Sequence, residues 1–179
     1  MTTVASMDKF KKLLTSQIPG LLRYTHALTG SLSDAENLLS ACLEYALLNK
    51  NRWNPEQKLS NWLYAIVHKI FVAQEPTGGK LEFRPSGRID LPADPEDERL
   101  QILLAQLPSA QREIFLLVTL MELDYASIAD ICDTTSNEVM LHLHAARKAI
   151  LSTREQAARG AIKHDPKPDK RNKDKVLEI

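Results

Sequence analysis

A segment of 23 residues rich in proline and glycine divides this chain of 179 residues into two parts. Its seven helix-disfavouring residues are Pro76, Gly78, Gly79, Pro85, Gly87, Pro92 and Pro95. Proline removes a backbone donor and glycine disfavours the helix, so 75–97 cannot form long regular structure. Helical patterns flank this segment over 8–74 and 98–151. We therefore expect two small helical domains joined by a linker, which is long enough to let them pack together or stay apart.

The composition indicates an all-α protein and excludes several other classes. Hydrophobic residues make up 44% and charged residues 26% of the chain, and glycines are few. No apolar run reaches the roughly 18 residues that span a bilayer, and the N-terminus lacks a signal-peptide core, so we expect a cytoplasmic protein without membrane insertion. Cys42 and Cys132 lie far apart in apolar patterns, which favours two buried thiols over a metal site. We expect no cofactor.

Charge is unevenly distributed, although the formal net charge is zero. Residues 73–97 carry 3 basic and 6 acidic side chains, and residues 98–151 carry 4 and 7. Residues 152–179 carry 8 basic and 5 acidic side chains, and we expect them to form a basic, disordered tail. Nucleic-acid-binding proteins usually concentrate positive charge on the binding domain, so the acidic 98–151 is unusual for one.

Two strong helical patterns lie within 8–74. Ser33-Asp34-Ala35-Glu36 has the form of a capping box, with Ser33 as the cap of a helix that runs to about Leu48. A helical wheel groups Ala35, Leu38, Leu39, Cys42, Leu43, Tyr45 and Ala46 on its apolar arc. The opposite face presents Asn37, Ser40, Ala41 and Glu44. A second helix begins near Ser60 and carries Trp62, Leu63, Ile66, Ile70 and Phe71.

The second half predicts a helix-turn-helix. A helix over 100–107 is followed by a restart at Pro108-Ser109 and a nearly all-apolar stretch, 114–121, that should be buried. Asp124 caps a short helix that ends near Cys132, and a turn follows. Thr135-Ser136-Asn137-Glu138 forms a second capping box, and Val139, Leu143, Ala146 and Ile150 make one apolar stripe. Generic helical packing is the alternative explanation of this pattern.

Several segments, in order, resemble the extracytoplasmic-function (ECF) subfamily of sigma-70 RNA polymerase sigma factors. Asp34-Ala35-Glu36-Asn37-Leu38 is similar to the "DAEDL" segment of region 2, and Trp62 to Lys69 to "WLFTILHN". Leu107 to Glu113 is similar to the "LPxxQRE" opening of region 4, and Leu123 to Ala129 to "LSYEEIA". Val139-Met140 and Ala146 to Ala149 resemble "TVMSRLHRARKAL". The set covers about 18–151 and most resembles the general-stress subgroup.

The resemblance implies a bacterial protein of transcription regulation and stress response that binds core RNA polymerase and promoter DNA, and is held by an anti-sigma factor. It implies binding without catalysis, so we expect no enzyme. Core polymerase would meet Asp34, Glu36, Asn37, Ser40, Ala41 and Glu44. Promoter melting would involve Arg52, Trp53, Lys58, Asn61, His68 and Lys69. The helix-turn-helix would present Ser136, Asn137, Glu138, Leu141, His142, His144, Ala145, Arg147 and Lys148 to DNA.

Ordinary structural roles compete with some of these assignments. Trp62 shares a face with Ile66 and is expected in the core, whereas Trp53 could equally be a packed loop anchor or a DNA contact. Lys58 and Lys69 could be solvated lysines. The histidines of the last helix could lie on its surface without a special role, or supply positive charge at low pH.

The chain also departs from the family where binding should occur. Asn37, Ser40 and Ala41 replace more acidic and polar family residues. On the last helix, Leu141, His142 and Ala145 stand where the family has serine, arginine and arginine. Our first hypothesis is an ECF sigma factor with divergent contacts. The alternative is a sigma-like decoy that binds an anti-sigma factor without promoter function, although the known decoys carry a receiver domain for which this chain leaves no room. A stand-alone helix-turn-helix repressor would leave the first domain unexplained.

Overall fold

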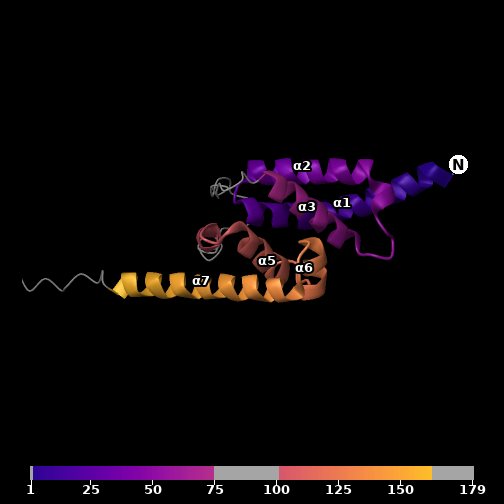
Figure 1. Ribbon diagram of the computed structural model, residues 1–179. Helices are drawn as coiled ribbons and strands as arrows, with labels where there is room; N and C mark the ends of the chain where they lie inside the picture. The colour runs from indigo at the N-terminus through magenta and orange to yellow at the C-terminus, as the bar shows by residue number, and fades with distance from the viewer. Residues whose placement is uncertain (1, 75–100, 163–179) are drawn as a thin grey trace, which may run out of the picture.

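The computed structural model describes residues 2–74 and 101–162, and both ranges are built from helices (Figure 1). The first range contains α1 (Thr2–Thr29), α2 (Leu32–Leu48), the short 3-10 helix η1 (Lys50–Arg52) and α3 (Leu59–Gln74). The second begins with helical residues 101–105 and continues with α5 (Ser109–Thr119), α6 (Tyr125–Ile131) and α7 (Ser136–Ile162). The all-α class with two helical groups is confirmed. The expected linker at 75–97 and the tail beyond 162 lie outside the described residues.

The long helix α1 ends in a tight reversal that sets the direction of α2. It continues through Pro19, which lies on the exposed surface. Gly30 follows α1 with φ 73°, and its N–H donates to the His26 carbonyl at 2.8 Å. A left-handed residue at this place is the usual end of a helix and favours glycine. The turn lays α2 alongside α1, as Figure 1 shows.

Helix α2 begins earlier than the sequence pattern predicted. Its N-cap is Ser31, whose hydroxyl accepts the Asp34 N–H at 3.4 Å, so Ser33 lies inside the helix and the predicted capping box is wrong. Ser31 takes this role because the chain reversal at Gly30 ends at Ser31, so α2 begins before Ser33 is reached. The buried face matches the predicted arc at Ala35, Leu38, Leu39, Cys42 and Ala46. Tyr45 is the exception, because it is 39% exposed at the edge of that arc.

Helix α3 and the helices of the second half bury the faces that their patterns predicted. Leu63, Ile66, Val67 and Phe71 of α3 are buried, while Trp62 is half-buried against the core. In α5, Ile114, Leu116 and Leu117 are buried, and Phe115 and Val118 pack against them. The stripe of α7 is buried at Val139, Leu143 and Ala146. Helix α7 extends to Ile162, beyond the end at residue 151 that the sequence predicted, so the first part of the expected tail is helical.

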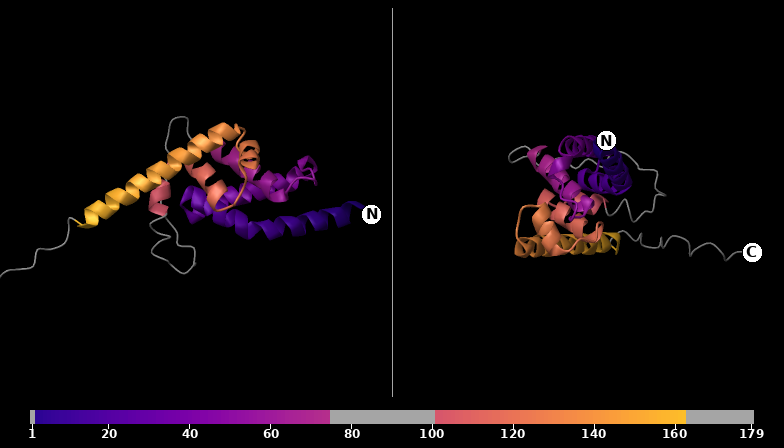
Figure 2. Two further views of the ribbon diagram at one scale, coloured as in Figure 1. Left: turned by 90° about the horizontal axis from the view of Figure 1, so that it is seen from below. Right: turned by 90° about the vertical axis from the view of Figure 1, so that its right-hand side faces the viewer.

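The two groups of helices share one continuous core. Buried side chains from α1 to α3 and from α5 to α7 form a single cluster, in which α1 contacts α5 and α3 contacts α6. The rings of Tyr24 and Tyr64 meet edge to face at 5.1 Å, and the Tyr64 hydroxyl lies 2.8 Å from the Met121 sulfur. Figure 2 shows the two groups stacked, with the C-terminal end of α7 extending away from the other helices. The structure therefore has the two domains packed together.

Candidate functional site

The outward face of α2 presents the polar residues that the helical wheel placed there. Asp34, Glu36, Asn37, Ser40 and Glu44 are exposed, and Ala41 is half-buried. This arrangement follows from the burial of the opposite face against α1 and α3. The face carries three carboxylates and two short neutral polar side chains. It can accept hydrogen bonds and cations from a partner, but it offers no cation of its own in α2.

A surface pocket joins the end of α2, η1 and α3. Its lining residues are Tyr45, Arg52, Trp62, Ala65, Ile66, Lys69 and Ile70. The Arg52 guanidinium donates to the Tyr45 hydroxyl at 3.4 Å, which holds one cation beside an aromatic ring at the rim. Lys69 is exposed on the α3 side. A cation can hold a phosphate, and an aromatic ring can stack a base. The pocket therefore offers both kinds of contact that proteins use to bind single-stranded nucleic acid.

The other residues that we expected to take part in promoter melting do not line this pocket. The Trp53 ring lies 5.8 Å from the Phe10 ring, and its indole N–H donates to the Gln57 carbonyl at 3.2 Å. Trp53 is therefore a packed anchor of the loop in this structure. Lys58 is exposed and Asn61 is half-buried near the start of α3, outside the pocket lining. Tyr45 and Trp62 were missing from the expected set, because the wheel assigned both to the apolar side.

The helix-turn-helix is fixed by two local caps. Asp124 caps α6 by accepting the Ser127 N–H at 2.9 Å. Asp133 makes the turn at φ 50°, and α7 then begins with a reciprocal capping box. In this box Thr135 Oγ1 accepts the Glu138 N–H at 3.2 Å, and the Glu138 carboxylate accepts the Thr135 N–H at 3.1 Å. Both predicted caps are confirmed, so the geometry expected of this motif is present.

The outward face of α7 exposes large apolar side chains, whereas DNA-binding surfaces are usually polar and positively charged. Leu141 is 68% exposed and Met140 is 47% exposed. The expected contact residues Ser136, Asn137, Glu138, His144, Arg147 and Lys148 are exposed, whereas His142 and Ala145 are half-buried. The Glu138 carboxylate is held by its capping bonds, chiefly to Thr134 and Thr135, which lower its pKa. From residue 136 to residue 146 the sequence has neither lysine nor arginine, so the first three turns offer no permanent cation to phosphates.

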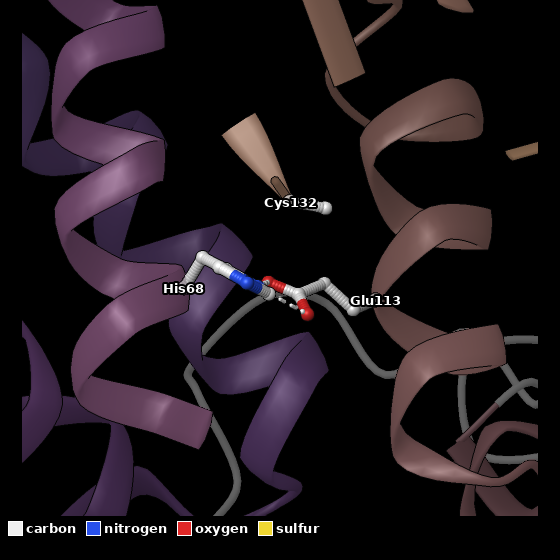
Figure 3. Close-up of side chains that lie close together, drawn as sticks. All are labelled: His68, Glu113 and Cys132. Carbon is white, nitrogen blue, oxygen red and sulfur yellow. Dashed lines mark hydrogen bonds and ion pairs between the residues drawn. The ribbon is translucent and has the colours of Figure 1, made fainter. Parts of the chain in front are cut away.

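A buried polar cluster lies where the two domains meet. Glu113 of α5 is only 3% exposed, and it accepts a hydrogen bond from the Tyr24 hydroxyl of α1 at 3.2 Å. His68 of α3 places Nδ1 3.1 Å and 3.0 Å from the two carboxylate oxygens of Glu113. The Cys132 thiol lies beside them at the end of α6 (Figure 3). His68, expected at the DNA, thus faces the second domain here.

The cluster alters the acid–base properties of its members. The hydrogen bond to Glu113 raises the pKa of His68 above its ordinary value, although burial acts in the opposite direction. Burial raises the pKa of the Tyr24 hydroxyl and of the Cys132 thiol, and the Glu113 charge adds to both effects. Tyr24 therefore stays protonated and can donate to Glu113. No local sequence pattern could have revealed this cluster, because its members lie on four elements far apart along the chain.

Two family models match separate parts of the chain. The model described as "Sigma-70, region 4" matches residues 97–150, and "Sigma2 domain of PhyR" matches residues 14–68. The ECF RNA polymerase sigma factor EcfG of Rhodopseudomonas palustris (strain TIE-1) is 24% identical over 151 residues, which are 80% of this chain and 83% of that protein. The chain therefore carries a sigma-70 region 4 domain and is similar to an ECF sigma factor over most of its length. The order of the two domains and the similarity to EcfG are consistent with the general-stress subgroup of this subfamily.

Solved structures of a sigma factor and of an anti-anti-sigma factor share the fold. The sigma factor RpoE of Bartonella quintana, in complex with the anti-sigma factor NepR, is 21% identical with a TM-score of 0.66, covering 80% of this chain and 95% of that one. The anti-anti-sigma factor PhyR of the same organism, also in complex with NepR, is 16% identical with a TM-score of 0.60. The match covers 80% of this chain but only half of PhyR. At these identities the likeness supports the fold alone.

Two further expectations concern enzymatic activity and membrane insertion. The family consists of sigma factors, which are not enzymes. Among the residues that the structure describes, no helix is both long enough and apolar enough to cross a membrane.

Proposed function

We propose that this chain is an ECF-type sigma factor that directs core RNA polymerase to promoters and assists DNA melting. The observation that carries the proposal is the ordered pair of a region 2 domain and a region 4 helix-turn-helix on one chain. We assign residues 8–74 to the first domain, 75–97 to the linker and 98–151 to the second domain. The similarity to EcfG, which extends over most of both chains, supports the same reading.

The first domain would hold the melted strand at the pocket between η1 and α3. Arg52 and Lys69 would contact phosphates, while Tyr45 and Trp62 offer ring faces for a base. Stacking of a base on an aromatic ring contributes about 1–3 kcal/mol, comparable with the few kcal/mol needed to unstack a base from duplex DNA. Lys58 and Asn61, at the start of α3, would extend the contact along the strand.

Core polymerase would bind the outward face of α2. Asp34, Glu36 and Glu44 supply carboxylates there, whereas Asn37, Ser40 and Ala41 supply weaker contacts. Each missing charge-assisted hydrogen bond lowers affinity by about 1.5–3 kcal/mol. We therefore expect docking to be weaker than in sigma factors with acidic or longer polar residues at these three positions.

We also propose that an anti-sigma factor binds this chain. Solved structures that share the fold include RpoE and PhyR, each with NepR, and CnrH with the cytosolic domain of CnrY. The CnrH structure is 14% identical with a TM-score of 0.63. The exposed apolar side chains of α7, Met140 and Leu141, are suited to a protein partner.

Run-off transcription with purified core polymerase on a promoter library tests the proposal. Initiation from a subset of promoters, together with retention of the chain on core polymerase, is the expected result. The double substitution Ser40→Gln with Ala41→Glu should raise core affinity, because it adds a longer amide and a carboxylate to the outward face of α2. The matched control is Thr15→Gln, at an exposed position on a different helix, α1.

A sigma-like decoy is the second candidate, and two observations favour it. The region 2 model that matches is the one from PhyR, which is itself described as an anti-anti-sigma factor. The outward face of α7 also lacks lysine and arginine over its first three turns. Tight binding of an anti-sigma factor, without retention on core polymerase and without initiation at any promoter, would establish the decoy and reject the sigma factor.

A further inference from the structure

The side chains of His68, Glu113 and Cys132 converge at the domain junction from three helical elements. One ligand atom of each, the His68 ring nitrogen, a Glu113 carboxylate oxygen and the Cys132 sulfur, lies within 4.8 Å of the other two. Figure 3 shows the imidazole and the carboxylate facing each other with the cysteine beside them. We propose that these three residues bind one divalent transition-metal ion of the zinc class, which bridges the two domains.

The identity of the ligands favours this class of metal. Imidazole nitrogen, thiolate sulfur and carboxylate oxygen are the three donors that zinc uses in proteins, whereas calcium and magnesium prefer oxygen donors alone. Zinc bonds of about 2.0–2.3 Å in a tetrahedron bring neighbouring ligand atoms to about 3.3–3.8 Å from one another. The His68 nitrogen and the Glu113 oxygens are already closer than that, at 3.0 Å and 3.1 Å. Closing the site thus requires a modest movement of the Cys132 side chain and a small opening of the His68–Glu113 contact.

Charge balance supports the same site. A thiolate, a carboxylate and a neutral imidazole neutralise the two positive charges of the ion, so the buried cluster would carry no net charge. An isolated charge in such a place is costly, whereas a neutral cluster is tolerated. Without metal, burial raises the pKa of the Cys132 thiol, so metal binding releases its proton. The fourth coordination position remains for water or another ligand.

Tyr24 fits the role of an outer partner of this site. Its hydroxyl donates to a Glu113 oxygen at 3.2 Å, which fixes the carboxylate in the direction of His68. Hydrogen bonds of this kind orient metal ligands and raise metal affinity. His68 belongs to the first domain, and Glu113 and Cys132 belong to the second. An ion held by all three would therefore stabilise the packed arrangement of the two domains.

Cobalt(II) provides the direct test, because a bound thiolate gives it a charge-transfer absorption band and a tetrahedral site gives it strong visible bands. The full-length chain, reduced and freed of metal with a chelator, is titrated with Co²⁺. We expect one equivalent to bind with both sets of bands, and Zn²⁺ to displace it. Zinc at a hundredfold excess over its Kd should raise Tm by about 5–10 °C. Absence of the charge-transfer band in the wild-type chain at millimolar Co²⁺ would reject the site.

The two cysteines supply a matched pair of variants. Cys132→Ser should abolish the charge-transfer band, whereas Cys42→Ser should keep it, because the Cys42 thiol bonds the Leu63 carbonyl inside the first domain. His68→Gln should lower Co²⁺ affinity at least tenfold. A band that persists in Cys132→Ser, or disappears in Cys42→Ser, would overturn the assignment. Should Cys132→Ser unfold, Cys132→Val takes its place, with circular dichroism of the metal-free chain verifying the fold. None of these measurements involves polymerase, so their outcome is independent of the proposed promoter function.

Discussion

The pocket between η1 and α3 and the outward face of α7 are both expected to meet DNA, yet they present different side chains. The pocket combines Arg52 and Lys69 with Tyr45 and Trp62. The first turns of α7 present Met140 and Leu141. Phosphate attraction and base stacking are therefore both available at the first surface, whereas the exposed cations Arg147 and Lys148 of α7 lie beyond its first three turns. From this difference we expect the first domain to carry most of the affinity for DNA, and region 4 to depend on a larger assembly.

The largest effect should come from reversing the charge of the pocket. Arg52→Glu together with Lys69→Glu should lower run-off transcription about 100-fold or more, because two charge-assisted contacts of about 1.5–3 kcal/mol each are lost. The same reversal at His144 and Lys148 of α7 should lower transcription less than about tenfold. If both charge reversals lowered transcription equally, the expectation that the pocket contributes more to DNA binding than α7 would be wrong. Retention on core polymerase, measured in parallel, separates melting defects from docking defects.

A second prediction concerns the junction that joins the two regions. Glu113→Ala should lower the free energy of unfolding by about 2–5 kcal/mol, because Tyr24 and His68 both lose a buried partner. Urea unfolding followed by circular dichroism measures this change. Asp130→Ala, at an exposed carboxylate of α6, is the matched control and should change the free energy by less than about 0.5 kcal/mol. Similar losses in both variants would show that the junction contributes little.

Adding cations to the outward face of α7 should give it the attraction for phosphates that the pocket already offers. Leu141→Arg with Ala145→Arg should strengthen non-specific DNA binding and steepen the slope of log K against log salt by about 1.8, at about 0.9 for each added phosphate contact. Fluorescence anisotropy at several salt concentrations provides the slope. Leu141→Gln with Ala145→Gln removes the apolar exposure without adding charge and should leave the slope unchanged. An unchanged slope in the arginine variant would mean that this face of α7 does not reach DNA.

The smallest effect should be the acid sensitivity of the helix-turn-helix caps. Hydrogen bonds to Ser127 lower the pKa of Asp124, and those to Thr134 and Thr135 lower that of Glu138. A carboxylate with a lowered pKa in the folded state stabilises the fold above its unfolded pKa, and this contribution disappears as the pH falls through the folded value. We therefore expect Tm to fall modestly below about pH 4. The double variant Asp124→Asn with Glu138→Gln should flatten this part of the pH profile; an unchanged profile would contradict the role of the caps.

Local patterns predicted the helices well, because caps and apolar stripes act over a few residues. Asp124 and Thr135 were identified as caps because their partners lie three residues away. Ser33 was wrong because Ser31 offers the same hydroxyl, and only the reversal at Gly30 decides between them. Tyr45 was misplaced because a wheel gives the centre of a buried arc more reliably than its edge.

The junction, in contrast, could not be predicted from local patterns. His68 and Glu113 are 45 residues apart along the chain, and residues 75–97 between them have no regular sequence pattern that would fix their relative positions. The two domains could have been separate or packed, and only the packed arrangement brings these side chains together. The same limit applies to Trp53, whose role was decided by the distant ring of Phe10.

The hydrophobic core that runs through both groups of helices has to be divided when the two groups separate. A partner that requires separated domains binds only the molecules that are open, so its apparent Kd is the intrinsic value divided by the open fraction. A packed population of 99 in 100 would weaken such a partner about a hundredfold. Any ligand that favours the packed arrangement would then lower transcription by mass action alone, without contacting the residues that meet polymerase or DNA.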